Sequence, residues 1–496
     1  MNRPLLAMTA SLAALAGLFT LLMNNPRTPQ SDSRSDNAVM VFCAASNRAV
    51  MEAIRSDYEA ETGRVLEIQY GPSQTLLSSI EVTGSGDLFL PADDSYLTLA
   101  KDKGMIAEVL PVAAQQGVIA VRKGNPKNVK AFDDLLRDDV RLVQASPDAA
   151  AIATLTRKTL QEQNLWDKLD AATTAYRTTV TEVANDVVVG AADAAIVYDA
   201  VLHTYPDLEF IEIPELNAVL SPIAVGVITG SKQPQQALHF ARYLSAIDKG
   251  LTRYEEHGFR VTGGDEWAEV PELSVFAGSM LRPAIDETIT EFEQREGVQV
   301  ARVYNGCGIL VAQMEAGQHP DAFFACDREF MQQVPDLFPE STDVSQNELV
   351  ILVQKNNPHG IASLKDLTHE GLKVGIGHEK QCAMGWLTQK TLEESGLKEE
   401  VMANVTVQTP TGDMLVNQMR TGSLDAAVVY LSNAAGSADF LDAVRIRGLD
   451  CSVATQPFAI AQKSRYRQLT SRLFQKIMSV DSRQTFEAEG FRWNAQ

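Results

Sequence analysis

Small polar turns that follow predicted strands and open predicted helices are the residues most suited to chemistry. Ser46 and Ser73 lie in two such turns, and Ser279 lies in a third. Backbone N–H groups at a helix start, the helix dipole and serine hydroxyls together bind an anion without a formal positive charge. An isolated serine of this kind would be a simple helix cap. The recurrence of the arrangement at four turns, two in each half of the chain, favours an anion site.

The cysteines are a second set of reactive side chains, and they are unevenly placed. Cys43 stands alone, whereas Cys307, Cys326, Cys382 and Cys451 lie in the second half of the chain. Five cysteines in 496 residues are too few for a disulfide scaffold. In an exported protein they would still be free to form a disulfide.

Composition excludes several classes of function. The chain has 43 Lys and Arg against 64 Asp and Glu, a net charge of −21, which disfavours nucleic acid as a partner. It contains no Gly-x-Ser-x-Gly elbow, no His-Glu-x-x-His pair and no Walker loop. We therefore expect neither an enzyme nor a resident cofactor.

The elements that must position the serines occur twice, because the chain contains an internal repeat. Four pairs of segments match at a nearly constant separation: 70–77 with 304–311, 87–93 with 321–327, 190–198 with 422–430, and 255–260 with 487–492. The repeat predicts two units, unit 1 over residues 39–262 and unit 2 over residues 272–496.

Within unit 1, short β-rich segments alternate with helical patterns. Strands are predicted over 39–43, 65–70, 117–122 and 194–198, and Gly63 is predicted to end the first helix. This alternation predicts an α/β fold in which parallel or mixed sheets carry helices on both faces. The length of each unit suggests two lobes with a cleft between them, and ligands of such folds bind beyond the carboxyl ends of the strands.

The N-terminal segment is a separate feature. Residues 5–23 are almost wholly apolar and follow Arg3, and a Pro- and Ser-rich stretch follows them. The pattern predicts a signal peptide or an N-terminal membrane anchor with a tether over residues 1–38. We expect a periplasmic or extracytoplasmic location. If residues 5–23 are retained as an anchor, they would tether the protein to the inner membrane.

In order and spacing, these motifs resemble two tandem copies of the periplasmic molybdate/tungstate-binding protein family, the receptors of ABC importers. The resemblance rests on Ala-Ala-Ser after the first strand, the segments 87–93 and 123–126, a Gly-x-x-Asp-Ala-x-Ile-Val-Tyr strand and a closing Gly-Phe. It implies a type II bilobal fold in each unit. It also implies that Ser46, Ser73, the amide of Val180 and the hydroxyl of Tyr198 bind a tetrahedral oxyanion in unit 1.

Unit 2 departs from the family pattern at several site positions. When unit 2 is aligned with the family's motifs, the resemblance implies Ser279, Cys307, Cys382 and Tyr430 as its anion-binding residues. Three interpretations of its cysteines remain open. Cys307 could form a disulfide with Cys326 or Cys382. The three thiols with His378 could bind a soft metal. Cysteine could also simply replace a small residue and act as a weak donor.

Together these observations predict an exported solute-binding protein that captures a small tetrahedral oxyanion, molybdate or tungstate first, for an ABC permease. Two other interpretations stay open at this point. One is a membrane-tethered oxyanion sensor, and the other is a metal- or thiol-handling protein that uses the cysteine-rich cleft of unit 2.

Overall fold

The computed structural model describes residues 38–261 and 263–494. The predicted signal peptide or anchor, including residues 5–23, lies outside the described residues. Within the described part of the chain, no helix is both long enough and apolar enough to cross a membrane.

Unit 1 is built on two sheets that share one strand. The strand order is β2-β1-β3-β9-β4-β7-β5-β6, with β8 and β10 also paired to β4. Strand β4 (Ile106–Arg122) pairs with β9 over residues 106–116 and with β7 over residues 117–121. We call the half of the unit around β1 and β9 lobe one and the half around β5 to β8 lobe two. The single long strand β4 therefore connects the two lobes.

The elements of unit 1 alternate as the sequence pattern predicts. Its strands are β1 (Val39–Ala44), β2 (Leu66–Gly71), β3 (Leu88–Leu90), β4 (Ile106–Arg122), β5 (Leu142–Ala145), β6 (Thr173–Arg177), β7 (Ala194–Tyr198), β8 (Leu208–Ile211), β9 (Leu220–Ile228) and β10 (Arg260–Val261). Its α-helices are α2 (Arg48–Thr62), α3 (Ser73–Thr83), α4 (Ser95–Asp102), α5 (Ala151–Glu162), α6 (Trp166–Ala172), α7 (Val180–Val188), α8 (Asp199–Leu202), α9 (Pro234–Leu244) and α10 (Gly250–Glu256).

Local chemistry accounts for these elements. Helix α2 buries Val50, Ile54 and Tyr58 at helical spacing and ends at Gly63, whose φ of 68° is a left-handed conformation that suits glycine. The predicted strand over 117–122 proved to be only the second half of β4. Its first half contains Pro111, which lies at a shift in the pairing register with β9 and which disguises the strand pattern.

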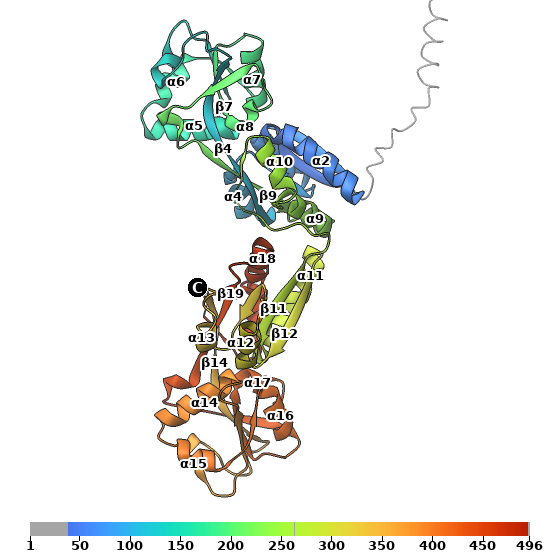
Figure 1. The fold of residues 1–496 in the computed structure, drawn as a ribbon, viewed down its shortest axis with the longest axis vertical. Coiled ribbons are helices and arrows are strands. Elements are labelled where there is room, and N and C mark those ends of the chain that lie inside the picture. Colours follow the sequence, from blue (N-terminus) through green and yellow to red (C-terminus); the bar gives the residue numbers. More distant parts are fainter. Residues whose placement is uncertain (1–37, 262, 495–496) are drawn as a thin grey trace, which may run out of the picture.

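Unit 2 repeats the topology of unit 1. Its strand order is β12-β11-β13-β19-β14-β17-β15-β16, the same path with each strand replaced by its counterpart. The fold class predicted from the sequence, two tandem bilobal α/β units, is therefore confirmed (Figure 1).

The strands of unit 2 are β11 (Glu272–Gly278), β12 (Gln299–Asn305), β13 (Ala322–Phe324), β14 (Thr342–Gln354), β15 (Val374–Gly377), β16 (Val405–Thr409), β17 (Ala426–Tyr430), β18 (Leu441–Arg445), β19 (Val453–Ile460) and β20 (Arg492–Trp493). The α-helices are α11 (Arg282–Glu296), α12 (Cys307–Glu315), α13 (Arg328–Met331), α14 (Ala383–Glu394), α15 (Lys398–Ala403), α16 (Gly412–Arg420), α17 (Leu431–Ala435), α18 (Arg467–Ile477) and α19 (Val480–Ala488).

The two units meet through a buried charge cluster. Glu296 on α11 is 2% exposed and accepts hydrogen bonds from Arg242 on α9 and from Arg472 on α18. Asp265, in the connection between the units, accepts from the amides of Gln468 and Leu469 at the start of α18, at 2.8 Å each. These contacts join lobe one of unit 1 to lobe one of unit 2, so lobe two of each unit lies at an outer end (Figure 1).

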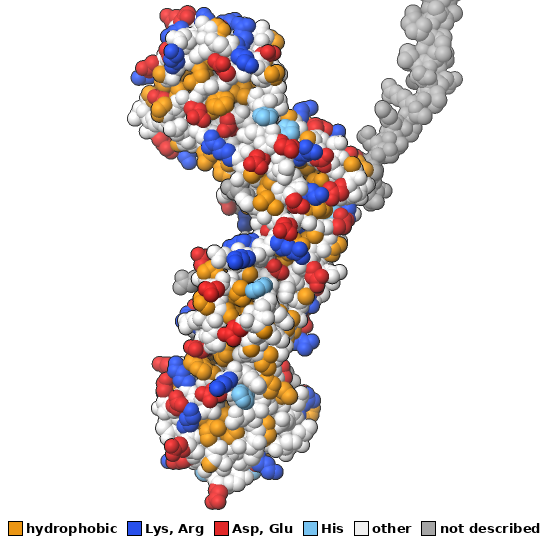
Figure 2. Space-filling view, viewed as in Figure 1, with side chains coloured by type: hydrophobic (Ala, Val, Ile, Leu, Met, Phe, Trp, Pro, Cys, Tyr) orange, Lys and Arg blue, Asp and Glu red, His pale blue; other side chains and the backbone are white. Residues whose placement is uncertain are grey.

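Charged side chains are spread over the surface. Figure 2 shows acidic and basic groups intermixed on the visible face of both units. The net charge of −21 is thus distributed, and the local character of any binding cleft is decided by the residues that line it.

Candidate functional site

A small cavity of about 20 Å³ lies between the two lobes of unit 1. Its lining includes all four residues that the resemblance implied for this unit, Ser46, Ser73, Val180 and Tyr198. The remaining lining residues are small or apolar: Ala44, Ala45, Gly71, Pro72, Ala92, Ala150, Ala151, Ile152, Thr178 and Thr179. Within residues 38–261 and 263–494, no charged side chain lines this cavity, so any ion in it would be held by neutral groups.

Three helices begin at the cavity wall. Helix α3 begins at Ser73 in lobe one, and α5 and α7 begin at Ala151 and Val180 in lobe two. The residues before α3 and α5, Pro72 and Ala150, provide no side-chain cap. First-turn N–H groups without a cap are available to an external acceptor, and the helix dipoles add positive potential at the same place. The start of α5 did not emerge from the sequence, since alanine gives no capping signal.

The serine hydroxyls are in position to donate. The Oγ atom of Ser46 is buried and has no hydrogen-bond partner. The Oγ atom of Ser73 accepts from the amide of Ala92 at 3.1 Å, which leaves the hydroxyl proton of Ser73 free. A buried hydroxyl without a partner costs free energy that a bound acceptor would recover.

Tyr198 is tied to a chain of hydrogen bonds behind the cavity. Ser221 donates to the carboxylate of Asp93 at 2.9 Å, so the phenol of Tyr198, 2.9 Å from Ser221, is the donor to Ser221. Burial holds the pKa of Tyr198 far above its ordinary value, so the hydroxyl keeps its proton. Sequence reasoning missed Ser221, because it lies 128 residues from Asp93 and no local motif marks it.

A wider cavity of about 580 Å³ adjoins the inner one and shares Ser46, Thr178 and Thr179 with it. Arg48 lines only this outer cavity, and its guanidinium lies 4.3 Å from the ring centroid of Tyr70. The cation thus stacks on an aromatic ring at the mouth of the cleft and does not enter the inner cavity.

Comparison with known sequences identifies the fold. The profile described as bacterial extracellular solute-binding protein matches residues 39–260 and, a second time, residues 273–492. The chain belongs to this solute-binding protein family. Members bind substrates and do not catalyse reactions, which confirms the prediction that the protein is not an enzyme. Within ABC importers, solute-binding proteins work outside the cytoplasm and deliver their ligand to a membrane permease.

Relatives of this solute-binding protein include molybdate-binding proteins. The molybdate-binding protein ModA of Mycobacterium tuberculosis is 26% identical over 250 residues, which are 49% of this chain and 93% of the relative. ModA of Escherichia coli is 24% identical over 142 residues, 27% of this chain and 55% of the relative. Among solved structures, the periplasmic molybdate-binding protein of Azotobacter vinelandii covers 45% of this chain and 100% of its own, at 15% identity and a TM-score of 0.41.

The second solute-binding unit differs from the first at the first serine. Gly278 pairs with Asn305 in unit 2 just as Ala44 pairs with Gly71 in unit 1. This register places Ser279 at the position of Ala45 and Met280 at the position of Ser46. The sequence-based match of Ser279 with Ser46 is therefore corrected, because the serine comes one residue earlier in unit 2.

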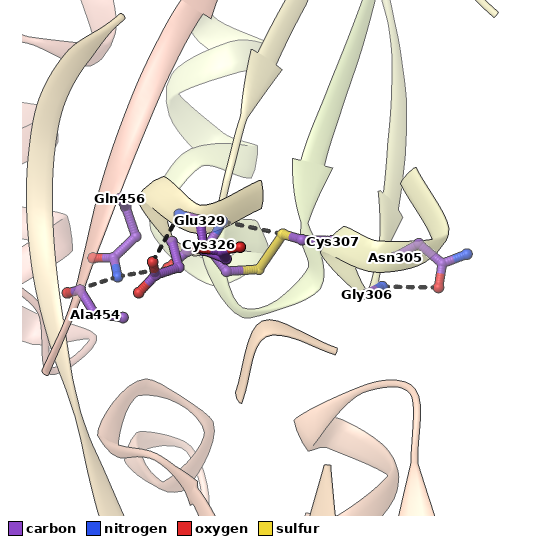
Figure 3. Close-up of a disulfide and its surroundings, with 8 residues drawn as sticks. Asn305, Gly306, Cys307, Cys326, Glu329, Ala454 and Gln456 are labelled. Carbon is purple, nitrogen blue, oxygen red and sulfur yellow. Dashed lines mark hydrogen bonds between the residues drawn. A yellow bond between two sulfur atoms is a disulfide. The ribbon is translucent and has the colours of Figure 1, made fainter. Parts of the chain in front are cut away.

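At the second serine position, unit 2 has a disulfide. Cys307 and Cys326 are bonded, with Cα atoms 6.4 Å apart (Figure 3). The amide of Cys326 donates to the sulfur of Cys307 at 3.1 Å, the same contact that Ala92 makes with Ser73. One of the two pairings left open by the sequence is thus present, and the alternative pairing with Cys382 is not, since Cys382 is free and buried.

The soft-metal interpretation of Cys307, Cys326, Cys382 and His378 does not fit the geometry. The disulfide uses two of the thiols. Over residues 38–261 and 263–494, no group of three potential ligands is placed to hold a metal ion. Burial also raises the pKa of the Cys382 thiol to about 11, which disfavours the thiolate that a metal would need.

The tyrosine of unit 2 lacks the support found in unit 1. The Oη atom of Tyr430 is buried and has no hydrogen-bond partner. Strand register places Ala454 opposite Asn347, at the position that Ser221 occupies opposite Gln115. Burial raises the pKa of Asp327, the counterpart of Asp93, to about 6. Of the four residues expected to bind an anion in unit 2, Ser279 is displaced by one position and Cys307 has no thiol proton.

Proposed function

We propose that unit 1 captures a small tetrahedral oxyanion between its lobes and that the chain delivers it to an ABC permease. Molybdate and tungstate are the leading ligands, followed by sulfate and phosphate. Ser46, Ser73, the amide of Val180 and the hydroxyl of Tyr198 would hold the ion, joined by the first-turn amides of α5.

The observation that carries this proposal is the state of Ser46. Its hydroxyl is buried without a partner on the wall of a cavity that has no charged lining residue and that three helix starts approach. Every polar side chain in the lining has a hydroxyl group that can donate a hydrogen bond. Such a wall suits an anion and disfavours a cation, which would find no carboxylate to neutralise it.

The mode of capture follows from where the donors lie. Ser46 and Ser73 belong to lobe one, whereas Val180, Tyr198 and the start of α5 belong to lobe two. An ion that takes hydrogen bonds from both lobes favours the closed form over the open form by the free energy of those bonds. Tyr198 would redirect its proton from Ser221 to the ion. Closure would then signal occupancy to the permease.

The name of the Mycobacterium tuberculosis relative, a molybdate-binding protein, supports molybdate as the first ligand to test. Isothermal titration calorimetry of the purified protein with molybdate, tungstate, sulfate and phosphate would rank the ions. We expect saturable binding of at least one of them. Absence of binding by all four would refute the proposal.

A further inference from the structure

We propose that unit 2 is a self-closed unit, whose lobe-two backbone fills the place that an anion takes in unit 1. The closure of unit 2 goes beyond the function proposed for unit 1 and does not depend on it. One consequence does rest on that function: the chain carries one oxyanion, bound in unit 1.

Two glycines bring the lobes of unit 2 into backbone contact. Gly306 and Gly308 flank Cys307 at the start of α12, in lobe one. A Cβ atom at Gly308 would lie 1.9 Å from the carbonyl oxygen of Lys380, in lobe two. A Cβ atom at Gly306 would lie 2.3 Å from the carbonyl oxygens of Gln381 and Pro410. Only residues without a side chain allow this approach.

Unit 1 has side chains at the same two positions. The strand register and the shared position of Ser73 and Cys307 pair Pro72 with Gly306 and Gln74 with Gly308. Pro72 lines the cavity of unit 1, whereas Gln74 does not. A side chain at either position leaves no room for the backbone contact that the two glycines allow in unit 2, which accords with the presence of a cavity at this point of unit 1.

The contacts in unit 2 also have the wrong polarity for an anion. Carbonyl oxygens carry partial negative charge, and those of Lys380, Gln381 and Pro410 crowd the start of α12, where the helix dipole would otherwise attract an anion. They occupy the space beside the helix start that a ligand would need. A bound oxyanion would have to displace three carbonyl groups before it could reach the helix.

The donors of unit 1 have been lost at the same place. Met280 takes the position of Ser46, and a disulfide sulfur takes that of the Ser73 hydroxyl. A thioether and a disulfide have no proton to donate. The hydroxyl of Tyr430 is one of several buried polar groups of unit 2 that have no partner among the described residues, and one ordered water could satisfy it.

The test measures the distance between lobes in each unit with pairs of spin labels and pulsed electron resonance. The matched positions are exposed: Val82 and Lys168 in unit 1, and Ala316 and Glu400 in unit 2, each replaced by cysteine. The background carries Cys451→Ser, since Cys451 is the partly exposed free thiol and Cys43 and Cys382 are buried. The full chain is measured with and without molybdate, tungstate and sulfate.

We expect one narrow distance in unit 2 that is identical with and without each ion. A broad or long distance in unit 2 that shortens when an ion is added would overturn the proposal. The unit 1 pair separates this result from the function proposed above. If unit 1 responds to no oxyanion, that function fails, whereas a narrow and unresponsive unit 2 still supports self-closure.

A variant tests the role of the glycines directly. Gly308→Gln places the unit 1 side chain at the contact with Lys380, and we expect the unit 2 distance to lengthen or broaden. Gln74→Gly in unit 1 is the matched control, and it should leave the unit 2 distance unchanged. An unaltered narrow distance in a folded Gly308→Gln protein would contradict the mechanism. If the Gly308→Gln protein does not fold, the proposal is decided by the unit 2 distance measured, with and without each ion, in the protein that keeps both glycines.

Discussion

The phenol oxygen of Tyr198 lies 2.9 Å from the hydroxyl oxygen of Ser221, which in turn donates to Asp93. In this contact the Tyr198 hydroxyl donates to Ser221 at the edge of the unit 1 cavity. The same hydroxyl can donate to a ligand when one binds. Unit 2 has Ala454 at the corresponding position, and its Tyr430 has no partner. The two units therefore share a fold but differ in the part of the site that holds a ligand.

Replacement of Tyr198 by Phe should weaken oxyanion binding. One buried donor is lost, which is worth about 1–3 kcal/mol, or roughly a 5- to 150-fold rise in Kd. Calorimetry measures the change. Tyr430→Phe is the matched control and should leave Kd unaltered. Equal effects of the two substitutions would show that the assignment of the site to unit 1 is incorrect.

Ser46→Ala and Ser73→Ala should separate binding from stability. The Ser46 hydroxyl has no hydrogen-bond partner among the described residues, so its removal should lower affinity without lowering the thermal midpoint. Ser73 accepts from Ala92, so its removal should lower both affinity and the free energy of unfolding, the latter by about 1–3 kcal/mol. Calorimetry and thermal unfolding report the two quantities. Wild-type affinity in Ser46→Ala would count against the site.

Asp327→Asn should stabilise unit 2 at neutral pH. The pKa of Asp327 is raised from 3.8 to about 6 by burial, so the folded state binds an extra proton between these values. Stability from this group is therefore present below pH 4 and is lost as the pH rises to 6. We expect a gain on the order of 3 kcal/mol at pH 7.5 and almost none at pH 4. Denaturant unfolding at both pH values measures it, and a gain that does not depend on pH would disagree with this account.

The Cys307–Cys326 disulfide should stabilise unit 2 without affecting ligand affinity. The two cysteines are 19 residues apart, and closing a loop of this size in the unfolded chain is worth about 3 kcal/mol. The double variant Cys307→Ser, Cys326→Ala installs the unit 1 residues at both positions. Its unit 2 transition should shift to lower denaturant, while Kd for the oxyanion stays the same. A large change in Kd would place the ligand in unit 2.

Much of the site could be predicted because it depends on order along the chain. Ser46 and Ser73 follow neighbouring parallel strands β1 and β2, whose carboxyl ends meet at one edge of the sheet. The position of Ser279 could not be read in the same way, since strand register and not residue identity decides which side chain faces the cleft. Ser221 stayed hidden because it reaches Tyr198 and Asp93 from β9, far along the chain.

The closure of unit 2 was also beyond sequence reasoning. In the sequence, Gly306 and Gly308 belong to a small polar turn that opens a helix. Their part in closure depends on the carbonyl groups of Lys380 and Gln381 on the opposite lobe. The sequence also could not decide the disulfide partner of Cys307, because both Cys326 and Cys382 were expected near the same cleft. Only the folded structure shows that the partner is Cys326.

The most direct measurement of the central claim is the number of oxyanions bound per chain, by equilibrium dialysis with molybdate, tungstate and sulfate, for the wild-type protein and for the Ser46→Ala, Tyr198→Phe double variant. We predict one ion per chain in the wild-type protein and none, at the same concentration, in the double variant. Binding of one ion that survives the double substitution, or no binding of any of the three ions, would contradict the account.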